Sequence, residues 1–145
     1  MLRPMPVREA SCHCGDLRLV CEGEPRKVSM CHCLDCQRRT GSAFSVAVFY
    51  ERATVRFEGP PAGRHTRGSA SGWPVHFFFC RRCGANLFWR PERIPELIGV
   101  ALGAFADPDF EPPSQSVWTR DKHHWLALPG EMAAFDAAPP GSPAA

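Results

Sequence analysis

The segment "MCHCLDCQRRTGSAF" (residues 30–44) places three cysteines, Cys31, Cys33 and Cys36, in one short stretch. Thiolates at this spacing are typical zinc ligands, and a structural zinc site in a protein uses four ligands. Two arrangements are possible for this cysteine trio. Either a fourth ligand comes from elsewhere in the chain, or the fourth position is left open for chemistry, as it is in catalytic zinc sites.

Two further cysteine pairs lie on either side of the trio. "SCHCG" (11–15) supplies Cys12 and Cys14, and "FCRRCG" (79–84) supplies Cys80 and Cys83. Each pair is followed by glycine, which lets backbone N–H groups turn toward the sulfurs as they do in a zinc knuckle. We expect this cysteine quartet to form a closed four-thiolate site, which would contribute free energy of folding and join the start of the chain to its middle.

The remaining cysteine and the polar neighbours of the trio are weaker ligand candidates. Cys21 shares one face of the alternating stretch "DLRLVCE" (16–22) with two leucines, so it is predicted to be a buried small hydrophobe. His32 is expected to point away from the adjacent sulfurs, and the Asp35 carboxylate is a harder ligand than a sulfur-rich shell prefers. Two alternatives stay open for the trio: an open fourth position, or a second structural zinc closed by a histidine or by Cys21.

Composition limits the classes of protein and partner. A chain of 145 residues with 17 basic and 15 acidic residues predicts one domain and gives no sign of nucleic-acid binding. No window approaches the roughly 20 apolar residues of a membrane span, and the start lacks the apolar core of a signal peptide. We therefore expect a cytoplasmic protein without membrane contact, in which eight cysteines indicate metal binding rather than the alternative, a disulfide framework. Oligomeric state is not predicted.

Frequent prolines and glycines divide the chain into short apolar or alternating runs, which predicts a mostly β domain of short antiparallel strands. A single turn of helix is expected around Leu34–Arg39. The domain is predicted to span residues 7–136, and the small-residue, proline-rich end (137–145) to be a disordered tail. The predicted strands are "DLRLVCE" (16–22), "AFSVAVFY" (43–50), "TVRFE" (54–58), "VHFFFC" (75–80), "NLFWR" (86–90) and "ELIGVAL" (96–102).

Charge indicates which chemistry an open trio would favour. A zinc ion held by three thiolates carries net negative charge, so it is a weaker Lewis acid than a zinc held by histidines. Such a centre suits the holding of a soft thiol as its thiolate better than the generation of hydroxide. Arg38 and Arg39 follow the trio directly and are either carboxylate-binding or ordinary surface arginines.

The cysteine segments, in this order and with "TGSAF" after the trio, resemble the glutathione-dependent formaldehyde-activating (Gfa) family. The fold implied by this resemblance is a zinc-stapled β-tent, also called the CENP-V/GFA domain. The resemblance covers about residues 7–136 and includes the closing segment "VWTRDKHHWLALPG" (117–130). One departure is Ser116, which stands where members of the family often carry a histidine.

The resemblance implies two Zn²⁺ sites and an activity. The quartet would hold a structural zinc, and the trio a catalytic zinc with an open position. The implied reaction condenses glutathione, or a related small thiol, with formaldehyde or another small aldehyde, which is a carbon–sulfur lyase reaction in reverse. The alternative function is that of a non-catalytic, zinc-stapled protein-interaction module. The substrate-binding residues would be Arg38, Gly41, Ser42 and Phe44.

Overall fold

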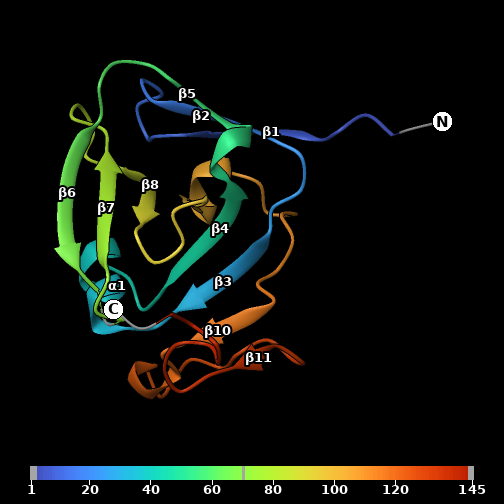
Figure 1. Ribbon diagram of the computed structural model, residues 1–145, viewed down its shortest axis with the longest axis vertical. Helices are drawn as coiled ribbons and strands as arrows, with labels where there is room; N and C mark the ends of the chain where they lie inside the picture. The colour runs from blue at the N-terminus through green and yellow to red at the C-terminus, as the bar shows by residue number, and fades with distance from the viewer. Residues whose placement is uncertain (1–2, 70, 144–145) are drawn as a thin grey trace.

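The computed structural model describes residues 3–69 and 71–143, whose strands form two sheets (Figure 1). The smaller sheet is antiparallel, in the order β1-β2-β5. Its strands are β1 (Val7–Ser11), β2 (Arg18–Glu22) and β5 (Val55–Glu58). The larger sheet has the order β11-β10-β3-β4-β9-β8-β7-β6. Its strands are β3 (Lys27–Cys31), β4 (Ser45–Glu51), β6 (Gly63–Gly68), β7 (Pro74–Phe79), β8 (Asn86–Pro91), β9 (Leu97–Ala101), β10 (Gln115–Val117) and β11 (Ala133–Ala134).

Helical structure is confined to short pieces. One α-helix connects β3 to β4, and three 3₁₀ turns complete the described elements. They are α1 (Leu34–Thr40), η1 (Arg52–Thr54), η2 (Leu102–Phe105) and η3 (Thr119–Asp121). Among the described residues, no helix combines the length and the apolar character needed to cross a bilayer.

The larger sheet is covered on both faces, which explains the continuous apolar run of β4. Val48 and Tyr50 are fully buried in the main core, which also contains Leu19 and Cys21 of β2 from the smaller sheet. Ala47 and Phe49 alternate with them and belong to a second cluster on the opposite face. Successive side chains of a strand point to opposite faces, so a strand covered on both sides reads as continuously hydrophobic.

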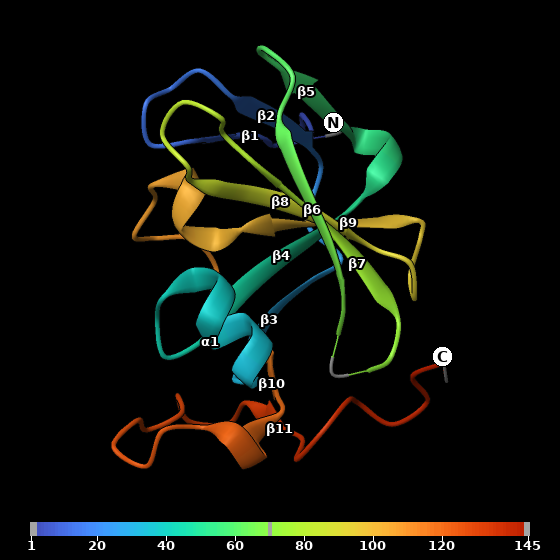
Figure 2. The same ribbon diagram turned by 90° about the vertical axis from the view of Figure 1, so that its left-hand side faces the viewer.

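The segment that carries the trio crosses from one strand to the next at one end of the larger sheet. β3 and β4 pair in antiparallel register, with Cys31 opposite Ser45, and α1 forms the connection between them. The helix ends at Gly41, which has a φ of 65° and donates its N–H to Gln37. Figure 2 shows α1 beside β3 and β4, with the smaller sheet at the far end of the molecule from β10 and β11.

The mostly β fold expected from the sequence is confirmed, as are all six predicted strands and the helical turn around Leu34–Arg39. The expectation of purely antiparallel pairing is wrong at one edge, because β10 pairs in parallel with β3 and with β11. A long connection after β9 brings β10 back to this edge, and parallel pairing requires such a crossover. The sequence analysis did not predict β1, β3, β6, β10 or β11.

The last segment of the chain contacts β10 and the loop between β6 and β7, both of which belong to the larger sheet or connect its strands. Trp73, in the loop between β6 and β7, donates its indole N–H to the backbone oxygen of Pro143 at 3.1 Å. β11 pairs with β10, and the backbone of Trp118 donates to Ala137. The domain boundary at residue 136 and the disorder of the tail in solution stay predictions.

Candidate metal centres and the cavity beside them

The cysteine quartet (Cys12, Cys14, Cys80 and Cys83) comes together from two distant parts of the chain. Its four sulfurs lie within 4.8 Å of one another, with 3.7 Å between Cys12 and Cys14 and 3.6 Å between Cys14 and Cys80. A tetrahedral zinc ion with Zn–S bonds of about 2.3 Å separates its sulfurs by about 3.8 Å. The quartet therefore fits a metal ion held by four sulfurs, in the pairing expected from the sequence.

Backbone geometry around the quartet stabilises thiolates. The N–H of Cys83 donates to the sulfur of Cys80 at 3.4 Å, and a backbone hydrogen bond from Ala85 is the largest cause that lowers the pKa of Cys83 to about 6. The glycines that follow the two pairs, Gly15 and Gly84, have φ values of 85° and 77°. This left-handed conformation is open to glycine at little steric cost and turns the N–H groups toward the sulfurs.

The cysteine trio is built by a strand end and a helix start. Cys31 is the last residue of β3, Cys33 is the N-cap of α1, and Cys36 lies in the first turn. The N–H of Cys36 donates to the sulfur of Cys33 at 3.3 Å, so this sulfur takes the role that an oxygen usually has at a helix N-cap. The three sulfurs lie within 4.8 Å of one another and can also hold a metal ion.

Protonation within the trio is uneven. Hydrogen bonds from the thiols of Cys31 and then Cys36, reinforced by N–H groups at the start of α1, lower the pKa of Cys33 to about 2. The same interaction with Cys33 is the largest cause that raises the pKa of Cys31. Binding of a metal ion by all three sulfurs would release the protons that the thiols carry.

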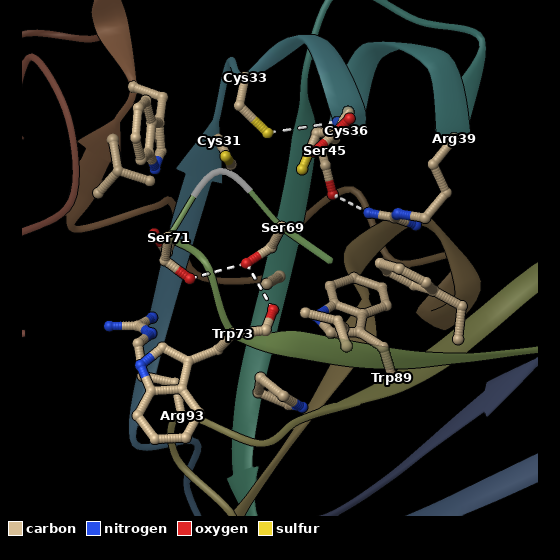
Figure 3. A pocket seen from close by; sticks show the side chains of 18 of the residues that line it. Cys31, Cys33, Cys36, Arg39, Ser45, Ser69, Ser71, Trp73, Trp89 and Arg93 are labelled. Atoms are coloured by element: carbon tan, nitrogen blue, oxygen red, sulfur yellow. Dashed lines mark hydrogen bonds between the residues drawn. The ribbon is translucent and has the colours of Figure 1, made fainter. Parts of the chain in front are cut away.

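A cavity of about 460 Å³, called the main cavity below, adjoins the trio (Figure 3). This volume lies in the range of roughly 300–1,000 Å³ that is typical of small-molecule sites. The walls come from strands β3, β4, β6, β7, β8 and β10, from helix α1, and from the loop between β6 and β7. Ala138 and Pro139 near the chain end also contribute. Of the two cysteine groups in the described part of the chain, only the trio lines this cavity.

The lining of the main cavity is strongly basic. Among the described residues, the one carboxylate that lines it is that of Asp35, which forms an ion pair of 2.6 Å with Arg67 and so is engaged away from metal binding. The apolar walls include Phe77 and Trp89. The cations of the lining are Lys27, Arg38, Arg39, Arg67 and Arg93.

The four substrate-binding residues expected from the sequence are divided by the structure. Arg38 lines the main cavity and is exposed. Gly41 and Ser42 lie outside the lining, beyond the C-terminal end of α1. Phe44 packs against His32, with 5.8 Å between ring centroids, and borders a different hollow. Their roles in substrate binding stay predictions.

Arg39 differs from Arg38 in being held by the walls of the main cavity. Its guanidinium donates to Ser45 at 2.7 Å and lies over the rings of Trp89 and Phe77, 4.4 Å and 4.9 Å from their centroids. A guanidinium stacked on two aromatic rings keeps a fixed position. Arg39 is therefore part of the cavity wall rather than a freely moving surface arginine.

Comparison with known proteins agrees with this arrangement. The profile of a family described as glutathione-dependent formaldehyde-activating enzyme (GFA) matches residues 7–121. This chain belongs to the GFA family. A protein of Halomonas elongata, provisionally named a glutathione-dependent formaldehyde-activating enzyme, is 26% identical over 126 residues, which cover 83% of this chain and 80% of that protein. A crystal structure of a Rhodobacter sphaeroides protein, 21% identical, shares the fold with a TM-score of 0.52 and covers 72% of this chain and 91% of that chain.

Two polar residues beside the trio have structural partners in this GFA-family chain. His32 is fully buried, and its Nε2 atom lies 2.7 Å from the hydroxyl oxygen of Ser116. Burial is the main cause that lowers the pKa of His32, so its ring is neutral at pH 7. The expectation that His32 points away from the neighbouring sulfurs is confirmed, and Ser116 belongs to this buried contact rather than to the cavity lining. Cys21 is also buried as predicted and lies in neither cysteine group.

The sequence analysis missed several residues of the main cavity. Trp73, Trp89 and Trp118 line it, and Trp89 also belongs to the second hydrophobic cluster. Lys27 and Arg93 line it as well. A signal for Lys27 was present, because the alternation of "KVSMC" (27–31) places it on the same strand face as Cys31.

The indole of Trp89 packs closely over Gly99, its cross-strand neighbour on β9, and a Cβ atom there would overlap the ring. We expect Gly99→Ala to displace this cavity wall and to lower the free energy of unfolding by about 1–3 kcal/mol. Gly103→Ala is the control, since a Cβ there meets nothing within 4 Å. Thermal unfolding of both variants measures the difference, and equal midpoints would contradict the close packing.

Proposed function

We propose that this GFA-family chain is a zinc-dependent enzyme that adds a thiol, glutathione in the first instance, to formaldehyde or a related small aldehyde. The observation that carries the proposal is that the trio supplies three sulfurs and faces the main cavity, whereas the quartet supplies four and does not. Three protein ligands with a fourth side toward a cavity are typical of catalytic zinc, and four thiolates of structural zinc.

The donor chemistry of both groups fits zinc. Cysteine thiolates are soft ligands, and sulfur-rich tetrahedral sites select zinc among the common divalent ions. The quartet would hold the structural ion and the trio the catalytic one. A zinc ion at the trio supplies charge that stabilises a substrate thiol in its nucleophilic, deprotonated form. We further propose that the domain spans residues 7–136. We also propose that the protein works in the reducing cytoplasm, where cysteine thiols stay available for metal binding.

The residues of the chain provide the setting for the reaction. In the addition, the thiol sulfur forms a bond to the aldehyde carbon, the carbonyl π bond opens, and the proton of the sulfhydryl passes to the aldehyde oxygen. Phe77 and Trp89 form an apolar wall that limits the access of water to the adduct. Arg38 lines the cavity and is exposed, so it is placed to contact a substrate carboxylate.

Cobalt substitution tests whether the trio accepts a further sulfur. We expect glutathione to change the sulfur-to-cobalt absorption of the Co²⁺-loaded protein, since a fourth thiolate would complete the trio but has no place at the quartet. In parallel, NMR should detect S-(hydroxymethyl)glutathione above the uncatalysed rate in the Zn²⁺-loaded protein. An unchanged spectrum together with the uncatalysed rate would rule out the proposed activity.

A non-catalytic, zinc-stapled interaction module is the second candidate. Such a module needs its metal only for stability, so both ions would resist exchange and neither would respond to thiols. The main cavity favours the enzyme, because a walled, basic cavity next to three potential metal ligands suits a small anionic substrate better than a flat protein partner.

A further inference from the structure

Lys27 and the trio share one side of a single strand. Lys27, Ser29 and Cys31 alternate along β3 and all line the main cavity, whereas Val28 and Met30 are buried on the other face. With a rise of about 3.3 Å per residue, the Cα atoms of Lys27 and Cys31 stand roughly 13 Å apart. The strand therefore fixes the spacing of the two backbone positions that carry the Cys31 sulfur and the Lys27 ammonium group.

Arg93 lies in the turn between β8 and β9 and reaches the same part of the cavity. Figure 3 shows Arg93 with Trp73 at the end of the cavity away from the three cysteines. Burial is the main cause that lowers the pKa of Lys27, and the charge of Arg93 is the next. Burial also lowers the pKa of Arg93. Two partly buried cations are thus held close enough to repel each other.

Neither cation has an acidic partner in the part of the chain that the structure describes. The neighbouring residue shows the contrast, because Arg26 is exposed and forms an ion pair with Glu51. Partial burial of unpaired cations is unfavourable unless an anion completes the site. A ligand anion is the natural partner for this pair.

The negative charge of the trio does not account for both cations. Arg93 and Cys31 both line the main cavity, and the charge of Cys31 opposes the lowering of the pKa of Arg93 by burial. The charges that act on Lys27 are instead those of Arg93 and Arg26. Lys27, which also lies 5.3 Å from the ring centroid of Phe49, stands at the far end of the cavity as a separate binding group.

We propose that Lys27 and Arg93 form a carboxylate-binding end of the main cavity, which selects thiols whose carboxylate lies far from the sulfur. The inference rests on the proposed function, which places the thiol at the trio. In free cysteine the sulfur and the carboxylate carbon are only about 4 Å apart, too close to engage both ends at once. In a peptide-sized thiol each further extended residue moves the terminal carboxylate about 3.5 Å farther from the sulfur, so such a ligand reaches from the trio toward Lys27 and Arg93.

Calorimetric titration with a sulfur-free probe tests the proposal without depending on catalysis. The probe is γ-glutamyl-2-aminobutyryl-glycine, in which a methyl group replaces the sulfhydryl of glutathione, added to the Zn²⁺-loaded protein. We expect Lys27→Gln and Arg93→Gln each to weaken its binding roughly ten-fold or more, as loss of a charge-assisted hydrogen bond does. The dimethyl ester of the probe should bind the unaltered protein about as weakly as the acid binds the two variants. Each variant should bind the acid and the ester with similar affinity.

Arg26→Gln is the matched control, because it removes a neighbouring cation that lies outside the cavity lining, and its affinity should equal that of the unaltered protein. The proposal is overturned if the cavity variants bind the probe like the control, if ester and acid bind the unaltered protein equally, or if the unaltered protein does not bind the probe. A protein that binds the probe through Lys27 and Arg93 but forms no hydroxymethyl adduct retains the carboxylate site and loses only the proposed reaction.

Discussion

Cys83→Ala is expected to unfold the protein at neutral pH. Binding of a structural zinc contributes on the order of 10–16 kcal/mol in zinc-finger peptides, whereas the net stability of a domain is about 5–15 kcal/mol. Loss of one of four thiolates therefore removes a contribution comparable with the whole stability. Cys83 is only half-buried, so its own packing is a small part of the effect. Circular dichroism, thermal unfolding and metal counting measure the result.

Cys21→Ala is the matched control for this variant. Cys21 is fully buried in the main core but belongs to neither cysteine group. Its replacement should cost about 1 kcal/mol, as a typical small core change does, and leave the metal content unchanged. If the Cys83→Ala and Cys21→Ala variants have the same midpoint of thermal unfolding, the quartet does not stabilise the fold through a metal.

Cys33→Ala is expected to abolish activity while the fold persists. The variant should hold one metal ion per chain instead of two, and hydroxymethyl adduct formation should fall to the uncatalysed rate. Cys33 also caps α1 by accepting the N–H of Cys36, so a stability loss of about 1 kcal/mol accompanies the loss of metal. Metal analysis, thermal unfolding and NMR assay of the adduct separate these effects.

Cys33→Ser distinguishes the two roles of this residue. The serine oxygen can still cap α1 but is a poorer ligand for the sulfur-selected metal. We expect this variant to recover the stability and to remain inactive. If Cys33→Ala and Cys83→Ala unfold alike, the division into a structural quartet and a catalytic trio is wrong.

The two cysteine groups lie at different places relative to the sheets. The quartet joins the connection between β1 and β2 to the turn between β7 and β8, next to the main core. The trio instead lies beside the main cavity, on the face of the larger sheet opposite the main core. The larger sheet thus lies between the quartet, which is beside the main core, and the trio, which is beside the main cavity.

The sequence alone determined both cysteine groups, six strands, the helical turn and the burial of Cys21. These features depend on short-range patterns: thiolate spacing, glycine after a cysteine pair, and alternation along a strand. Such patterns are sufficient because a metal knuckle and a strand face are each built from residues within a few positions of one another.

The cavity was decided by tertiary structure. Lys27 and Arg93 meet only because β3 and the turn after β8 border the same hollow, and Trp73 and Pro139 join them from a hairpin loop and from the end of the chain. The parallel pairing of Gln115 with Ser29 is equally invisible in local sequence. The physical reason is that the local pattern fixes which face a side chain takes, whereas packing between distant segments fixes what that face meets.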